Sequence, residues 1–78
     1  MKAKEAIELA RARSARAQEF YERVQGAIAD GGVTGCYMFA IGAETFYYGF
    51  DGIDLHCGKH TKKRAAYLIE HGLAEVIA

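Results

Sequence analysis

The chain has 78 residues, and ten basic side chains balance ten acidic ones, so its formal net charge is zero. A chain of this length makes one domain with a thin core, because small domains hide only about 60% of the surface of the unfolded chain. The hydrophobic fraction of 51% and the charged fraction of 26% exclude a disordered or collagen-like protein, and the neutral charge argues against a uniformly basic nucleic-acid binder.

Residues 2 to 30 are predicted to form one long helix, because good helix formers dominate and no glycine occurs before Gly26. Their apolar side chains fall on one arc of about 160°. A helix of about 28 residues is about 42 Å long, whereas strands of six or seven residues span about 20 Å. We therefore expect half of this helix to lack a partner within the chain.

The two halves of the helix differ in their apolar residues. The bulky Phe20 and Tyr21 lie in the C-terminal half, which we expect to cover a sheet. The N-terminal half carries small residues with the 4-3 spacing of a heptad seam and is predicted to form a homodimer; the alternative is a solvated helix end. The expected dimer interface consists of Ala3, Ile7, Ala10, Ser14 and Ala17.

Residues 33 to 57 are predicted to form a three-stranded antiparallel meander. Gly42 and Ala43 suit a glycine-first hairpin turn, and Asp51 with Gly52 is typical of a type I′ turn. Alternation along the strands then gathers apolar side chains on one face, with Glu44 as the only polar exception. That face comprises Tyr37, Phe39, Ile41, Phe46, Tyr48, Phe50, Ile53, Leu55 and Cys57.

The C-terminal part is predicted to form a second helix over residues 62–71, with Thr61 as its N-cap and Gly72 as its C-cap glycine. Gly58 is expected to end the third strand. Residues 73–77 suit either a short fourth strand or a terminal helical turn. We therefore expect residues 1–78 to form a single α+β domain with a long N-terminal helix, a three-stranded antiparallel meander, a second helix and a short C-terminal strand.

Basic residues concentrate in two blocks, 11–16 and 59–64. Three cations of the second block occupy the first turn of the second helix, where the helix dipole disfavours them, so that an anion or an acidic surface would offset the cost. The alternative is a solvated turn that is screened by salt. The predicted partner-binding residues are Arg11, Arg13, Arg16, Tyr47, His56, Lys59, Lys62, Lys63 and Arg64.

Arg13 would project from the apolar arc of the helix. The guanidinium groups of the first block suit phosphate or carboxylate ligands. The alternative for Arg13 is a side chain that snorkels to solvent or pairs with Glu5 or Glu8 in a dimer.

His56, Cys57 and His60 resemble a metal-binding cluster, but adjacent strand residues point to opposite faces and no Cys-x-x-Cys pair is present. The same alternation separates Cys36 from Cys57 and argues against a disulfide between them. A sheet this small offers little depth for a substrate pocket. We therefore expect no metal, no cofactor and no enzymatic activity.

The segment 36–41 is the longest apolar stretch and is far shorter than the roughly 18 residues that span a membrane. The N-terminus has no charged segment followed by an apolar stretch and a cleavage site, and two cysteines cannot build a disulfide scaffold. These features predict a cytoplasmic protein with reduced cysteines that does not associate with membranes.

Two functions fit this sequence. The first is a non-catalytic protein-binding module, because the chain is rich in the tyrosine and arginine that dominate interface hot spots. The second is a nucleic-acid binder that contacts phosphates through blocks 11–16 and 59–64. Neutral net charge and the lack of helix-turn-helix spacing or of an RNA-recognition signature count against the second function.

In its size, its α+β build and its lack of a catalytic constellation, the chain resembles the small phage-encoded anti-CRISPR proteins. That group shares no motif, so the helix rich in alanine and arginine and the aromatic hairpin at residues 37–50 are not specific to it, and no residue role is carried over. The resemblance implies a stoichiometric inhibitor that binds a Cas protein of a CRISPR–Cas surveillance complex in the host cytoplasm. Many of those inhibitors are acidic mimics of DNA, and the neutral charge of this chain departs from that pattern.

Overall fold

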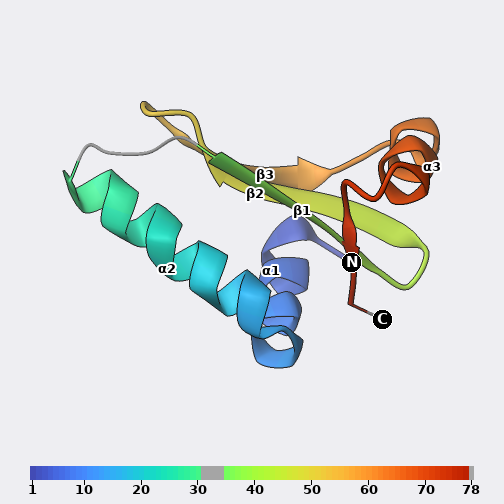
Figure 1. Ribbon diagram of the computed structural model, residues 1–78, viewed down its shortest axis with the longest axis horizontal. Coiled ribbons are helices and arrows are strands. Elements are labelled where there is room, and N and C mark those ends of the chain that lie inside the picture. The colour runs from blue at the N-terminus through green and yellow to red at the C-terminus, as the bar shows by residue number, and fades with distance from the viewer. Residues whose placement is uncertain (31–34, 78) are drawn as a thin grey trace.

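The computed structural model describes residues 1–30 and 35–77. Its strands form one mixed sheet of order β3-β2-β1-β4, in which β1–β2 and β2–β3 are antiparallel and β1–β4 is parallel. Helices α1 and α2 lie on one side of the sheet and α3 lies on the other (Figure 1). In chain order the elements are α1 (Ala3–Arg13), α2 (Ala15–Asp30), β1 (Gly35–Ile41), β2 (Glu44–Phe50), β3 (Leu55–Lys59), α3 (Lys62–Glu70) and β4 (Glu75–Val76).

The predicted α+β class is confirmed, but the sheet has four strands and is mixed rather than a purely antiparallel meander of three. The additional strand is β4, which selects the strand alternative for residues 73–77. Its pairing with β1 includes a hydrogen bond of 2.8 Å from the Ile77 N–H to the Ala40 carbonyl oxygen. None of the helices in the described ranges is long and apolar enough to cross a membrane.

The prediction of one long N-terminal helix is wrong, because the helix is interrupted at Ser14, between α1 and α2. This residue has extended backbone angles, φ −132° and ψ 121°. Its N–H ends α1 by donating to the Ala10 carbonyl at 2.8 Å, and its side-chain oxygen accepts from the Ala17 N–H at 3.3 Å. Ser14 thus caps the end of α1 and the start of α2, a role for which serine is well suited.

The break changes the environment of the predicted dimer interface. Ile7, Ala10 and Ala17 are at most 8% exposed and belong to the hydrophobic core of the chain. Ala3 packs against the same core, and Ser14 forms the helix junction. The prediction that these five residues form an accessible dimer interface is therefore wrong, because α1 packs on its own sheet instead of projecting beyond it.

The first hairpin has the predicted register, with Ile41 opposite Glu44 across the turn. Phe39 and Phe46 lie opposite each other at the centre of the core, at 1% and 0% exposure, and their ring centroids are 5.7 Å apart. Aromatic pairs at this distance add stability beyond the area that they bury. The apolar face that we predicted for this hairpin is confirmed as the face covered by α1 and α2.

The second turn differs from the predicted two-residue turn. Phe50 pairs with Leu55, so that residues 51–54 form a four-residue loop. The Asp51 carboxylate holds this loop by accepting from the N–H groups of Ile53 and Asp54 at 2.8 and 2.7 Å. Ile53 is 84% exposed instead of facing the core.

The third strand also extends beyond its predicted end. Gly58 pairs with Tyr47 inside β3, and the strand continues to Lys59. The prediction that this glycine ends the strand is therefore wrong.

Helix α3 covers part of the second face of the sheet, near the β1–β2 turn (Figure 1). Leu68 and Ala65 are its buried residues, and Ala40 and Thr45 of the sheet are buried as well. The predicted cap is confirmed, because the Thr61 hydroxyl accepts from the Arg64 N–H at 3.3 Å.

Candidate functional site

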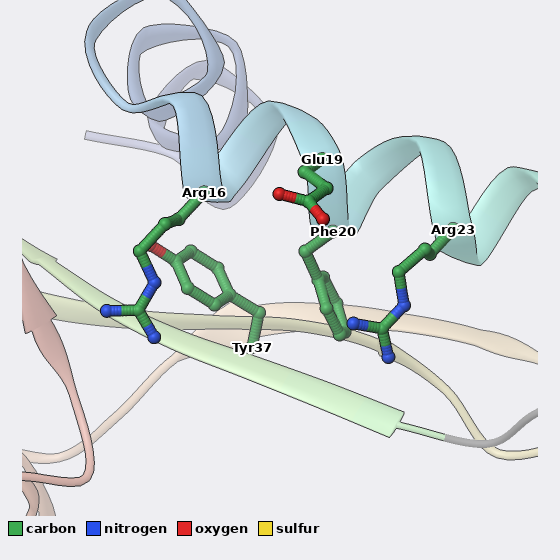
Figure 2. A pocket seen from close by; sticks show the side chains of 5 residues that line it. All are labelled: Arg16, Glu19, Phe20, Arg23 and Tyr37. Carbon is green, nitrogen blue, oxygen red and sulfur yellow. The ribbon is translucent and has the colours of Figure 1, made fainter.

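A hollow of about 220 Å³ lies between α2 and β1. Helix α2 contributes Arg16, Phe20 and Arg23, whose i, i+4, i+7 spacing places them on one face. Figure 2 shows both guanidinium groups reaching from α2 toward β1, beside the rings of Phe20 and Tyr37. The fifth lining residue is Glu19, whose carboxylate stays close to the helix.

The aromatic rings of this hollow are only partly covered. The Phe20 and Tyr37 centroids are 5.4 Å apart, and the Arg23 guanidinium carbon lies 5.7 Å from the Phe20 centroid. In the described part of the chain, no carboxylate lies within 4.0 Å of either Arg16 or Arg23 to form an ion pair. Two exposed cations therefore flank two aromatic surfaces.

A second hollow, of about 400 Å³, continues from the first along the edge of β1. Arg16 and Tyr37 line both hollows, and the second is completed by Cys36, Met38 and residues 72–75. We call the two hollows together the α2–β1 groove.

Two hydrogen bonds hold the middle of this groove. The Tyr37 hydroxyl donates to Glu75 Oε2, and the Ser14 hydroxyl donates to Glu75 Oε1 at 3.3 Å. The helix junction, β1 and β4 are thereby joined through one carboxylate. Tyr37 and Glu75 are consequently held in place in the groove before any partner binds.

The three arginines of the block 11–16 do not form one surface. The Arg11 guanidinium lies 3.6 Å from the Tyr21 centroid, and its Nε donates to Gln18 at 2.8 Å. Arg11 thereby braces α1 against α2 beside β3, away from the groove. Arg13 is an exposed residue at the end of α1, and only Arg16 lies in the groove.

In the block 59–64, Lys59 differs from the other cations because it forms an ion pair within the chain. Its ammonium group contacts Glu44 at 2.7 Å, and the N-terminal ammonium group lies 3.4 Å from the same carboxylate. The hydrogen bond from Lys59 lowers the pKa of Glu44. Lys59 pairs with Phe46 across the strands and thus lies at the end of the sheet face that α1 and α2 cover.

The other three cations of this block are exposed in the first turn of α3. The Arg64 guanidinium carbon lies 5.2 Å from the Tyr67 centroid, and Tyr67 stacks on His71 at 4.0 Å. Together with Lys62 and Lys63 they form a basic and aromatic surface along α3. We call these five residues the α3 surface.

Tyr47 and His56 lie on the second face of the sheet, on the part that α3 leaves open. They line an apolar depression of about 380 Å³ with Cys36 and Gly49. Partial burial raises the pKa of the Cys36 thiol, so that the reactive thiolate is disfavoured. Within the described residues, no group of three or more histidine, cysteine or acidic side chains could hold a metal ion.

The His56 ring contacts the Asp51 carboxylate at 2.6 Å. Hydrogen bonds from the N–H groups of Asp54 and Ile53, and then the His56 contact, lower the pKa of Asp51 from 3.8 to about 2. Because the pKa is lower in the folded state, the ionised carboxylate stabilises the fold above about pH 4, and this contribution is lost as the pH falls through about 2.

The Asp51→Ala variant is expected to be less stable than the unmodified chain at neutral pH and to lose less stability between pH 4 and pH 2. Urea unfolding across a pH series measures the effect. The same change at Asp30, at the end of α2, is the matched control. Parallel pH profiles for the Asp51→Ala variant and the unmodified chain would contradict the expectation.

Sequence reasoning found Arg16 but missed Phe20, Arg23 and Tyr37 as members of one site. The helical spacing of Arg16, Phe20 and Arg23 was a usable signal. The position of Tyr37 beside them depends instead on how α2 packs on β1. No protein-family model, curated protein or solved structure matches this chain.

Proposed function

We propose that this protein is a non-catalytic protein-binding module whose α2–β1 groove binds an acidic segment of a partner. The observation that carries this proposal is the pair of Arg16 and Arg23, which lie beside partly exposed aromatic rings and form no ion pair with any described residue. Guanidinium groups bind carboxylates through two parallel hydrogen bonds, and arginine and tyrosine dominate interface hot spots.

The pKa of Cys36 counts against the use of this cysteine as a catalytic nucleophile. A nucleophilic cysteine needs a lowered pKa or an adjacent base, whereas the pKa of Cys36 is raised.

A Cas protein of a CRISPR–Cas surveillance complex is the first partner to test, given the resemblance to small anti-CRISPR inhibitors. The two arginines would be repelled by the basic groove with which such a protein holds nucleic acid. We therefore propose that inhibition of this kind would use an acidic surface of the Cas protein.

The variant Arg16→Glu/Arg23→Glu is expected to weaken partner binding at least tenfold, because truncating or reversing a desolvated charge at an interface costs about 2–5 kcal/mol. Biolayer interferometry with a purified, nuclease-treated type I surveillance complex measures the affinity, and circular dichroism confirms the fold of each variant.

The variant Lys62→Glu/Lys63→Glu is the matched control, since it makes the same change of charge on another helix. It should bind like the unmodified chain. Equal binding by the groove variant and the unmodified chain would contradict the proposed site.

A second candidate function is nucleic-acid binding through the α3 surface. The observation that favours it is the row formed by Arg64, Tyr67 and His71, with two further exposed lysines beside it. Single-stranded nucleic acids bind to such combinations of basic and stacking side chains. Salt-sensitive binding of an oligonucleotide that is lost in Lys62→Glu/Lys63→Glu and kept in the groove variant would favour this function.

A further inference from the structure

Part of the edge of β1 next to the α2–β1 groove has no strand partner. β4 pairs with β1 only at Phe39 and Ala40, so that among the described residues no strand lies beside residues 35–38 on this edge. The hydrogen bond from the Ile77 N–H to the Ala40 carbonyl shows that the main chain of Ala40 faces this edge. Alternation along the strand directs the main-chain groups of Cys36 and Met38 to the same edge.

The groove runs along this open edge. One wall is α2 with its two arginines, and the other wall is formed by residues 72–75. Four residues of an extended strand span about 13 Å. The open edge at residues 35–38 therefore offers the main-chain groups for a short extended segment of about 13 Å beside β1.

We propose that the partner segment binds as an added β-strand along residues 35–38, with acidic side chains on the side that faces α2. This inference rests on the proposed function and adds the conformation and the residue pattern of the ligand. In strand addition, main-chain hydrogen bonds provide affinity and pockets for alternate side chains provide specificity.

The charges around the groove favour acidic residues at alternate positions of the added strand. Arg16 and Arg23 are seven residues apart in α2, which corresponds to about 10 Å along the helix axis. Side chains two residues apart in a strand are about 7 Å apart and point to the same side, within reach of two long arginine side chains. Of the two acidic groups in the groove, Glu75 already accepts two hydrogen bonds and Glu19 stays close to α2.

The remaining residues of the added strand would face away from α2. On that side the groove is lined by Cys36, Met38 and Leu73, whose side chains favour apolar contacts. The expected ligand therefore alternates acidic and apolar residues, whereas a basic or an all-polar segment would not fit both walls.

The test uses the full chain labelled with ¹⁵N and the synthetic peptide Glu-Val-Glu-Val-Glu-Val as probe. We expect chemical-shift changes at residues 35–38 and around Arg16 and Arg23, with slower hydrogen exchange at the amides of Cys36 and Met38. The peptide Lys-Val-Lys-Val-Lys-Val should bind at least tenfold more weakly, and the variant Arg16→Glu/Arg23→Glu should reverse the preference.

A probe with the same side chains and a methyl group on every main-chain nitrogen separates strand addition, parallel or antiparallel, from simple charge attraction. It cannot donate main-chain hydrogen bonds, and its binding should fall at least tenfold. A protein variant gives the complementary test: Cys36→Pro removes an edge N–H and should weaken the unmethylated probe, whereas Cys36→Ala should not. The N-methylated probe keeps the test valid if the proline variant does not fold.

The outcomes distinguish this inference from the proposed function. Equal affinity for the methylated and unmethylated probes would overturn strand addition and leave acidic recognition intact. Equal affinity for the glutamate and lysine probes would overturn the proposed function itself. Shift changes confined to the α3 surface, or displacement of the probe from residues 35–38 by single-stranded DNA, would also overturn strand addition of an acidic segment.

Discussion

Replacing Gly49 by alanine is expected to lower the free energy of unfolding by about 3 kcal/mol, the upper end of the usual cost of overpacking. A Cβ atom at Gly49 would lie 2.4 Å from the Gly35 carbonyl oxygen and 2.9 Å from Cys36 Cα. Both atoms belong to the main chain of β1, so that relief requires the strand itself to shift. A domain of this size is stabilised by about 4–12 kcal/mol, and the loss would be a large part of that total.

Two other glycines provide controls for this substitution. A Cβ atom at Gly26, inside α2, meets no atom within 4 Å, and Gly26→Ala should stabilise the chain by about 0.5–1 kcal/mol. At Gly58 the nearest atom is the Tyr47 hydroxyl oxygen at 2.5 Å, the far end of a side chain that can move. Gly58→Ala should therefore cost less than Gly49→Ala.

Urea unfolding followed by circular dichroism measures the order of the three glycine variants. The expected order of stability is Gly26→Ala, then Gly58→Ala, then Gly49→Ala. A Gly49→Ala variant as stable as the unmodified chain would show that β1 can move away from β2 at this point without loss.

The Phe46→Ala variant is expected to lose about 3–5 kcal/mol, the usual cost of removing a fully buried phenylalanine. Phe46 is 0% exposed, and its ring stacks on Phe39, which in turn stacks on Tyr37 at 5.6 Å. Its removal leaves a cavity beneath α1 and α2 that the surrounding residues fill only in part. For a chain of this size, the melting temperature should fall by about 15 °C or more.

Thermal unfolding of Phe46→Ala is best compared with that of Ile53→Ala. Ile53 is 84% exposed, and its truncation should change stability by no more than about 0.5 kcal/mol. A melting temperature for Phe46→Ala within a few degrees of that of Ile53→Ala would contradict a core centred on the Phe39 and Phe46 pair.

The first hairpin could be predicted because its determinants are local. Gly42 adopts the positive φ of 62° that a two-residue turn needs, and the period of two then places every later side chain. The second turn was predicted two residues too short, because the Asp51 carboxylate closes a longer loop. Because the loop is longer than predicted by two residues, the alternation of side chains is kept. Leu55 and Cys57 therefore still lie on the predicted side of the sheet, and only Ile53 leaves the strand for the loop.

The break at Ser14 could not be predicted from helix propensity, because the residues on both sides of it are good helix formers. A serine N-cap contributes about 1 kcal/mol, which is too little by itself to interrupt a long helix. The break gains its stability from tertiary burial, since Ala6 and Ala10 of α1 reach 0% and 1% exposure in the core. Burial of this kind is not visible in the spacing of the sequence.

Sequence patterns alone suffice to predict the α+β class, the register of the β1–β2 hairpin, the capped helix α3 and the placement of Arg16, Phe20 and Arg23 on one helix face. These features depend on turn chemistry, capping and periodicity, which act between near neighbours in the chain. Two further features come from the tertiary fold: α1 packs on the sheet, and β4 covers just two residues of β1. Both outcomes depend on contacts between segments far apart in sequence, and together they create the α2–β1 groove and its open strand edge.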